Sequence, residues 1–209
     1  MSEPIVYIVD DDHSMRRSLT RLMKSAGYRS TAFASAREFL DSDRQHDGPA
    51  CVVLDVRMPG LSGLELQTEL ANNPPGPAII FITGHGDVPM SVRAMKKGAV
   101  DFLLKPFQDK ALLQAIALAL DRNVRDRAAF AERRQVQARA EMLTPREREV
   151  LELVVTGMLN KQIAAQLGTT EKTVKTHRGR VMEKMAVESL AQLVRDAEKI
   201  GIPAARPTA

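Results

Sequence analysis

Short apolar runs alternate with longer amphipathic segments over the first half of this 209-residue chain, and this alternation constrains its fold more than any other feature. Apolar runs that alternate with helical segments are typical of parallel strands buried on both faces. We therefore predict an α/β doubly wound sheet of five parallel strands in the order 2-1-3-4-5. The expected strands lie near 5–9, 28–33, 50–54, 78–82 and 100–104, and the expected helices near 14–26, 35–43, 62–72 and 88–97.

Polar residues stand where these strands are expected to end. Asp10 and Asp11 follow the first strand, Asp55 the third, Thr83 the fourth and Lys105 the fifth. In an open α/β sheet the working groups collect at the carboxyl ends of the strands, where the strand order reverses. Three carboxylates brought together repel one another unless a cation joins them, and Mg²⁺ (or Mn²⁺) suits carboxylate oxygens. We therefore expect a Mg²⁺ site at this edge of the sheet.

Asp55 is the candidate nucleophile of this site. A carboxylate can accept a phosphoryl group when nearby cations neutralise the transferred charge. Lys105 would supply a fixed positive charge and Thr83 a hydroxyl. Taken singly, an aspartate at a strand end is more often a helix N-cap, and a lone lysine is an ordinary surface residue. The combination favours phosphoryl transfer.

Several neighbouring residues have structural explanations. A solvated or helix-capping role for Asp12 is at least as well supported as a role at the metal. His85 and Asp87 are expected to be loop residues rather than metal ligands. Cys51 lies in an apolar run, which favours an inert buried thiol. Turn-shaping roles in the loop after the third strand are expected for Pro59, Gly60 and Gly63.

Charge and length indicate a second domain. Residues 1–121 carry a net charge of −2 and residues 122–209 a net charge of +6. A basic surface suits a polyanion, although a salt-bridged helical surface would have the same composition. We predict a first domain over 1–121, a helical linker over 122–142, a second domain over 143–201 and a tail over 202–209.

The segment between Pro106 and Pro145 contains neither glycine nor proline, which favours one long helix. An apolar stripe runs along its first part and weakens beyond Arg125, so this part should pack on the sheet. The stripe consists of Leu112, Leu113, Ile116, Leu120 and Val124.

The second domain is predicted to begin with a capped helix. Thr144 and Glu147 form a T-x-x-E capping box around a proline. A short helix near 161–167 should follow, and a third helix should open after Thr169 or Thr170. Two short helices joined by a tight turn that contains glycine are the pattern of a helix-turn-helix, whose second helix enters the major groove of DNA.

The third helix of this domain has two different faces. At 100° per residue, Val174, Val181 and Met185 fall on one buried stripe. His177 lies beside that stripe and is expected to be a hydrogen-bonded structural histidine rather than a base reader. Cations and hydroxyls on the opposite arc can reach phosphates and base edges, and a glycine allows close approach. The candidate DNA-binding residues are Lys161, Lys172, Thr173, Lys175, Thr176, Arg178, Gly179 and Arg180, with phosphate contact or packing expected for Arg178.

Four segments resemble, in order and spacing, the receiver domain of bacterial two-component response regulators: VDDD, LDVRMPGLSG, ITGHGDVPM and LLKPF. The resemblance implies a flavodoxin-like fold in which Asp55 is the phosphoacceptor for a sensor histidine kinase and Lys105 contacts the phosphoryl group. It also implies Mg²⁺ ligands at Asp10, Asp11, Asp55 and the backbone carbonyl of Arg57, and a cis peptide between Lys105 and Pro106.

The same resemblance implies how phosphorylation of Asp55 would change the surface of the receiver domain. Thr83 would turn its hydroxyl toward the phosphoryl oxygens and Phe102 would move inward, although core packing alone also explains Phe102. The face that this pair remodels, formed by the fourth helix and the fifth strand, commonly forms a homodimer in receivers.

Residues 143–185, beginning LTPRE, resemble the LuxR-type output domain, a four-helix module. With the receiver, this resemblance indicates the FixJ/NarL group of transcription regulators, and the segments GHGDVPM and HRGRVM favour its FixJ-like branch. It implies a phosphorylation-activated protein that binds promoter DNA and works with RNA polymerase. The alternatives are an aspartyl phosphatase, for which no second acid accompanies the nucleophile, and an RNA or protein partner for the helical domain.

The chain has no stretch of ~18 apolar residues and no basic segment followed by an apolar signal core at its start. We therefore expect a cytoplasmic protein without a membrane partner. We expect no enzymatic activity beyond its own phosphorylation and dephosphorylation.

Overall fold

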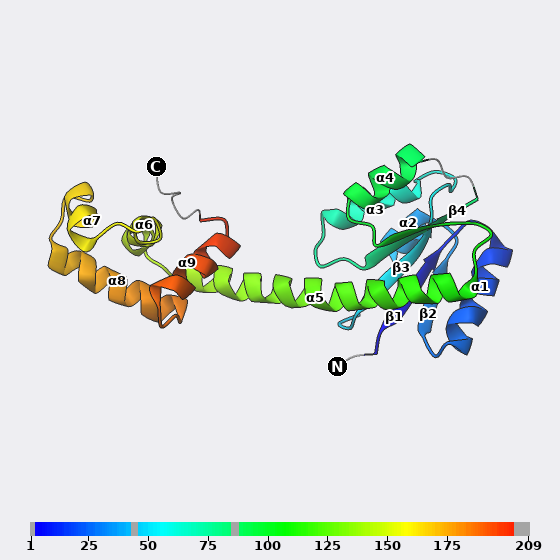
Figure 1. The fold of residues 1–209 in the computed structure, drawn as a ribbon, viewed down its shortest axis with the longest axis horizontal. Coiled ribbons are helices and arrows are strands. Elements are labelled where there is room, and N and C mark those ends of the chain that lie inside the picture. Colours follow the sequence, from blue (N-terminus) through cyan, green and yellow to red (C-terminus); the bar gives the residue numbers. More distant parts are fainter. Residues whose placement is uncertain (1–2, 43–45, 85–87, 203–209) are drawn as a thin grey trace. The chain divides into compact units, whose positions relative to one another are not determined.

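The computed structural model describes residues 3–42, 46–84 and 88–202. It divides the chain into two compact units, Met1–Ala128 and Ala129–Ala209. Figure 1 shows a sheet flanked by helices in the first unit and a group of helices in the second. No helix in the described part is both long and apolar enough to cross a bilayer.

Five parallel strands form the sheet of the first unit in the order β2-β1-β3-β4-β5, which confirms the predicted doubly wound α/β fold. Every residue of β1 and β3 is buried, as expected for strands covered on both faces. Burial raises the pKa of the Cys51 thiol in β3 to about 12, in agreement with the predicted inert thiol. The strands are β1 Ile5–Val9, β2 Arg29–Phe33, β3 Ala50–Asp55, β4 Ala78–Thr83 and β5 Asp101–Leu104.

Helices cover both faces of this sheet and bury two apolar clusters. Successive residues of a strand point to opposite faces, so Tyr7 joins the cluster that contains Phe39 of α2, whereas Ile8 joins the one that contains Met23 of α1 and Ile116 of α5. The two faces of the sheet therefore bury mainly apolar side chains, and the polar side chains of the candidate site lie at the strand ends. The helices of this unit are α1 His13–Ser25, α2 Ala36–Asp41, α3 Gly63–Ala71 and α4 Val88–Lys96, together with the first part of α5 Asp109–Glu141.

Helix α5 is continuous over 33 residues, as the missing glycine and proline predicted. Its first part packs on the sheet through most of the predicted stripe. The prediction is wrong at Val124, whose side chain is 46% exposed. The buried members of the stripe are Leu112, Ile116 and Leu120, and Leu113 is partly buried.

Asn123 faces the sheet in place of Val124. Asn123 is buried, its Oδ1 accepts from the N–H of Ala50 at 2.9 Å, and its Nδ2 donates to the carbonyl of Gly76 at 2.8 Å. One turn later, Arg127 donates to a loop carbonyl at 2.7 Å. The helix past residue 121 is therefore held to the first unit by polar contacts.

The second unit is a helical bundle whose core includes the end of α5. Val136 and Ala140 are buried in that core, and the ammonium of Lys199 lies 2.8 Å from the carboxylate of Glu132. The boundary between the units thus falls inside the segment 122–142. The four expected helices are α6 Pro145–Val154, α7 Asn160–Gln166, α8 Glu171–Met185 and α9 Leu190–Lys199.

The capping box that begins α6 is confirmed, and an ion pair reinforces it. Thr144 Oγ1 accepts from the N–H of Glu147 at 3.3 Å, and the Glu147 carboxylate accepts from the N–H of Thr144 at 2.9 Å. Lys184 Nζ in α8 lies 2.6 Å from the same carboxylate. The hydrogen bond from Lys184, with help from Thr144, lowers the pKa of Glu147 to about 2.

Glu147→Gln should lower the free energy of unfolding by about 2 kcal/mol near neutral pH, because the buried carboxylate loses its charge-assisted bond to Lys184. The folded-state pKa lies below the ordinary value of 4.5, so the carboxylate stabilises the fold above pH 4.5. This contribution disappears as the pH falls toward 2. Urea unfolding of the wild type and the variant should differ at neutral pH and converge in acid.

The control is Glu149→Gln, which removes a half-exposed carboxylate from the same helix. It should change the free energy of unfolding by less than about 0.5 kcal/mol. A difference between the wild type and Glu147→Gln that stays constant below pH 4.5 would show that the ion pair is not its source.

Candidate functional site

Three carboxylates meet at the carboxyl end of the sheet. Asp10 and Asp11 follow β1 and Asp55 ends β3, and one carboxylate oxygen of each lies within 4.8 Å of the other two. The pairing of β1 with β3 accounts for this, because the two strand ends lie side by side. Asp10 and Asp55 are buried, whereas Asp11 is exposed. The structure therefore brings together the acidic residues that the sequence singled out.

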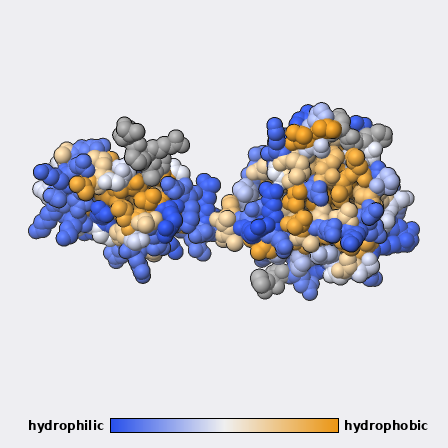
Figure 2. Space-filling view, in the orientation of Figure 1, coloured by the Kyte–Doolittle hydropathy of each residue, from blue (hydrophilic) through white to orange (hydrophobic). Residues whose placement is uncertain are grey.

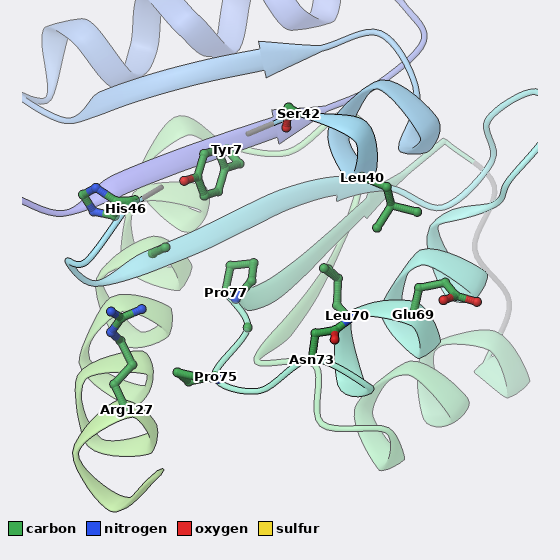
Figure 3. A pocket seen from close by; sticks show the side chains of 12 residues that line it. Tyr7, Leu40, Ser42, His46, Glu69, Leu70, Asn73, Pro75, Pro77 and Arg127 are labelled. Carbon is green, nitrogen blue, oxygen red and sulfur yellow. The ribbon is translucent and has the colours of Figure 1, made fainter. Parts of the chain in front are cut away.

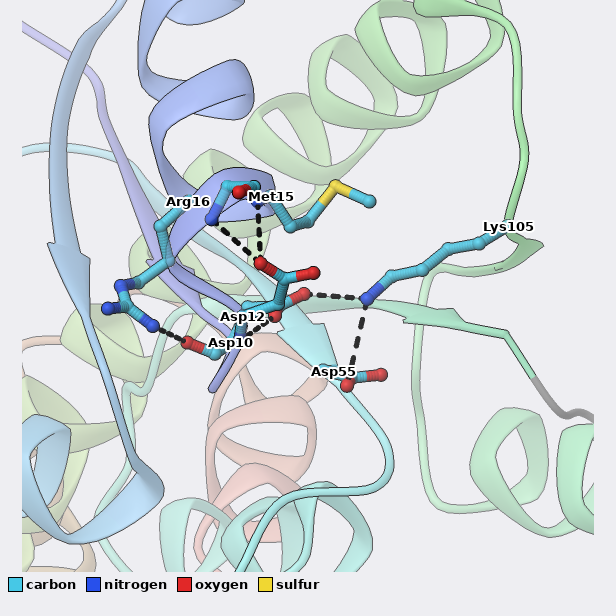
Figure 4. Close-up of polar contacts among 7 residues, drawn as sticks. Asp10, Asp12, Met15, Arg16, Asp55 and Lys105 are labelled. Carbon is cyan, nitrogen blue, oxygen red and sulfur yellow. Dashed lines mark hydrogen bonds and ion pairs between the residues drawn. The ribbon is translucent and has the colours of Figure 1, made fainter.

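Lys105 reaches the same point from the end of β5 (Figure 4). Its ammonium lies 2.7 Å from Asp10 Oδ2 and 3.6 Å from Asp55 Oδ2. Its backbone N–H donates to the carbonyl of Thr83 at 2.8 Å, and its peptide bond to Pro106 is cis, as expected. A fixed positive charge thus lies between two of the carboxylates.

Asp55 is partly desolvated and incompletely paired. Burial raises the pKa of Asp55, Lys105 opposes that effect, and Asp10 raises the pKa further. Asp55 Oδ1 is buried and has no hydrogen-bond partner among the described residues. Because buried polar atoms normally have a partner, this oxygen and its carboxylate neighbours fit a hard divalent cation with oxygen ligands.

Asp12 and Arg16 support the site from the start of α1 (Figure 4). Asp12 Oδ1 accepts from the N–H groups of Ser14 and Met15 at 2.7 and 3.4 Å, so the helix-capping role is confirmed. Arg16 donates to the carbonyl of Asp10 at 2.6 Å, a contact that the sequence analysis missed. The sequence could have indicated this contact, because it has an arginine one turn into the helix that follows Asp10 and Asp11.

The loop after β3 returns close to Asp55. A Cβ on Gly63 would overlap with the carbonyl oxygen of Asp55 and would lie 3.1 Å from the Cα of Val56. Gly60 has a φ of +77°, in the left-handed region that favours glycine. Both glycines therefore shape this loop as predicted. The side chain of Arg57 is exposed, which is compatible with a role for its carbonyl alone.

Thr83 and Phe102 lie on the neighbouring strands β4 and β5. Thr83 ends β4 and is 1% exposed. Phe102 is half-buried, and its ring centroid lies 6.1 Å from that of Phe81, so core packing accounts for part of its role. The remaining loop residues considered from the sequence, His85 and Asp87, lie outside the described residues.

A second group of candidate residues lies on α8, where the predicted division into two faces is confirmed. Val174, Val181 and Met185 are buried in the core of the second unit. Thr170 caps the helix by accepting from the N–H of Thr173 at 3.2 Å. The exposed residues of the opposite arc are Lys172, Lys175, Thr176, Gly179 and Arg180, with Thr173 half-buried beside them and Lys161 exposed on α7.

Two residues of α8 lie between the buried and exposed faces. Arg178 is half-buried and donates to Asn160 Oδ1 at 3.2 Å, so it ties α8 to the start of α7. The hydrogen bond expected for His177 is absent at its Nδ1, which is buried and has no partner in the described part of the chain, whereas its structural rather than base-reading role stays a prediction. The helical wheel placed this ring near the core but could not identify a partner for it.

A separate pocket of about 320 Å³ lies at the amino ends of the strands (Figure 3). Tyr7, His46 and Arg127 line it on one side, and Glu69 and Leu70 of α3 lie on the other. None of the three clustered carboxylates lines this pocket. It is therefore distinct from the candidate site at the carboxyl ends.

Two families of known proteins match the segments that contain these two groups of residues. The response regulator receiver domain family matches residues 6–117, and the luxR family of bacterial regulatory proteins matches residues 141–197. The chain is 54% identical to nodulation protein W of Bradyrhizobium diazoefficiens over 97% of this chain and 89% of that protein. It is 46% identical to the transcriptional regulatory protein FixJ of Azorhizobium caulinodans, over 94% of this chain and 93% of that protein. The solved structure of the response regulator StyR matches with a TM-score of 0.72 at 48% identity, over 95% of this chain and 100% of that chain.

Proposed function

Because the chain belongs to the FixJ/NarL family of response regulators, which join a receiver domain to a luxR-type DNA-binding domain, we propose that phosphorylation of Asp55 switches its binding to promoter DNA. The phosphoryl donor is a cognate sensor histidine kinase. The observation that carries the proposal is the unpaired, buried Oδ1 of Asp55 next to Lys105 and two further carboxylates.

The chemistry is a transfer between two protein side chains. A carboxylate oxygen of Asp55 attacks the phosphorus of the kinase phosphohistidine, the P–N bond breaks, and its electron pair stays on the imidazole nitrogen. Lys105 neutralises charge on the phosphoryl oxygens from its place beside Asp55. Asp10, Asp11, Asp55 and the Arg57 carbonyl would hold Mg²⁺ (or Mn²⁺), which supplies further neutralisation of phosphoryl charge when bound.

The switch operates through Thr83 and Phe102. The Thr83 hydroxyl turns toward the new phosphoryl oxygens, and Phe102, already half-buried, moves further inward. A homodimer then forms through the face of α4 and β5. This face carries apolar side chains in solvent, and orange residues lie along α4 in Figure 2. The exposed apolar residues are Val88, Val92, Met95 and Leu104.

The second unit reads DNA with its basic face. Charge supports this assignment, since residues 129–209 carry a net charge of +4. Arg178 holds α7 against α8 and contacts a DNA phosphate. The dimer works with RNA polymerase at a promoter, and we place the protein in the cytoplasm. No activity on other substrates is assigned beyond phosphorylation and dephosphorylation of the chain itself. The DNA-contacting residues are Lys161, Lys172, Thr173, Lys175, Thr176, Arg178, Gly179 and Arg180.

The proposal is tested with the full-length protein and acetyl phosphate as a small phosphodonor. With Mg²⁺ present, intact mass should increase by one phosphoryl group, and affinity for a duplex selected from a random-sequence pool should increase with it. Chelation of the metal should abolish both changes. A protein that binds the duplex equally well before and after phosphorylation would contradict the switch, and tighter binding to RNA would contradict the DNA assignment.

Lys175→Ala should weaken binding to DNA by about tenfold, because Lys175 is exposed on the outer arc of α8 and its charge releases counterions from the duplex. The slope of log affinity against log salt should become shallower by about 1. Fluorescence anisotropy at several salt concentrations measures both quantities. Lys110→Ala, an exposed lysine on α5 in the first unit, is the matched control and should change neither. An unchanged salt slope in Lys175→Ala would remove Lys175 from the interface.

A further inference from the structure

Leu159 is an unusual residue at the start of the first helix of the helix-turn-helix. It occupies the N-cap of α7, where serine, threonine, asparagine or aspartate would accept a bond from the first turn. The other helices that begin in this unit have the side chains of Thr144, Thr170 and Ser189 as N-caps. Leu159 is also 69% exposed, so neither capping nor core packing explains it.

Leu159 lies at the start of a helix that packs against α8, which carries most of the candidate DNA-binding residues. The next residue, Asn160, accepts from Arg178 of α8 at 3.2 Å, so the start of α7 lies against the middle of α8. Lys161 follows and is exposed, and Lys175 is exposed one turn before Arg178 on α8. An apolar side chain in solvent thus borders a group of cations.

We propose that Leu159 packs against a deoxyribose ring of the DNA backbone. This inference rests on the proposed DNA binding. In a helix-turn-helix the second helix lies in the major groove while the first crosses the backbone, so the exposed start of α7 meets sugar and phosphate. Lys161 and Arg178 supply charge for the phosphates, and the leucine covers the C–H surface of the sugar between them. Leu159 therefore increases DNA affinity, although its side chain cannot accept a hydrogen bond from the first turn of α7.

The test is Leu159→Ser in the full-length protein, because the two effects have opposite signs. Serine supplies the missing cap, so the thermal midpoint of the second unit should rise by about 4 °C. Affinity should fall about fivefold. The loss should be equal for a duplex selected by the wild type and for one of scrambled sequence, because a sugar contact carries no sequence information. The salt slope should stay unchanged, since no charge is removed.

Two control variants separate the contact from a general surface effect. Leu159→Met keeps an apolar side chain and should retain wild-type affinity. Met142→Ser removes another exposed apolar side chain of the same unit, 59% exposed and outside α7 and α8, and should also leave affinity unchanged. Unchanged affinity in Leu159→Ser overturns the contact, and so does a loss confined to the selected duplex. Failure of the wild type itself to bind DNA would instead overturn the proposed function.

Discussion

Full-length protein with Asp55→Asn is expected to take up no phosphoryl group from acetyl phosphate, a decrease of at least about 100-fold in the phosphorylated fraction. The asparagine amide has the same shape as the carboxylate but lacks the anionic oxygen that attacks phosphorus. The fold should persist, because burial already disfavours the charge of Asp55, as its raised pKa shows. Intact-mass measurement after incubation with the donor and Mg²⁺ gives the phosphorylated fraction directly.

The matched control is Asp12→Asn, the same chemical change close to the same site. Asp12 caps α1 through its Oδ1, and asparagine is an equally good N-cap. The phosphorylated fraction should therefore stay within about twofold of the wild type, since Asp12 contacts backbone N–H groups rather than Asp55. Phosphorylation of Asp55→Asn at the wild-type level would place the phosphoacceptor elsewhere. An equal loss in both variants would indicate that the whole acidic loop, rather than Asp55, is responsible.

The site could be predicted from the sequence because its geometry follows from the sheet. Once the apolar runs are assigned to parallel strands in the order 2-1-3-4-5, the ends of β1 and β3 must be neighbours. Asp10 and Asp55 then approach one another whatever the details of packing. The same reasoning places Lys105 at this edge, because it follows a strand of the same sheet.

Contacts between distant segments could not be predicted in this way. Helical periodicity indicates which face of a helix is buried, but it does not identify the partner across the interface. The structure therefore gives two polar partners that no pattern indicated: Asn123 bonds to Ala50 across 73 residues, and Lys184 bonds to Glu147 across 37. In both cases a polar side chain occupies a buried position because its partner satisfies it there.

The helical wheel of α8 shows the same limit. It correctly divided Val174, Val181 and Met185 from the exposed arc, since that division depends only on the helix itself. It could not predict that His177 Nδ1 lacks a hydrogen-bond partner among the described residues, because such a partner depends on the neighbouring helices.

Gly63→Ala is expected to destabilise the first unit by about 3 kcal/mol and to reduce phosphorylation of Asp55 as well. A methyl group at this position overlaps with the backbone carbonyl of Asp55 and lies 3.1 Å from Val56 Cα, so backbone rather than a flexible side chain must move. The N–H of Gly63 also donates to the carbonyl of Val56 at 3.0 Å, which holds the loop in place. Relief of the overlap therefore displaces the end of β3 that carries the nucleophile.

Gly84→Ala provides the matched control for this variant, because a Cβ at Gly84 has no neighbour within 4 Å among the residues that the structure describes. The same substitution there should change the free energy of unfolding by less than about 1 kcal/mol. Urea unfolding followed by circular dichroism gives the stability of each variant. Intact mass at low temperature, where Gly63→Ala remains folded, gives its phosphorylated fraction. Wild-type stability in Gly63→Ala would show that the loop between β3 and α3 can move away without strain. The close approach of Gly63 to the Asp55 carbonyl would then not position Asp55.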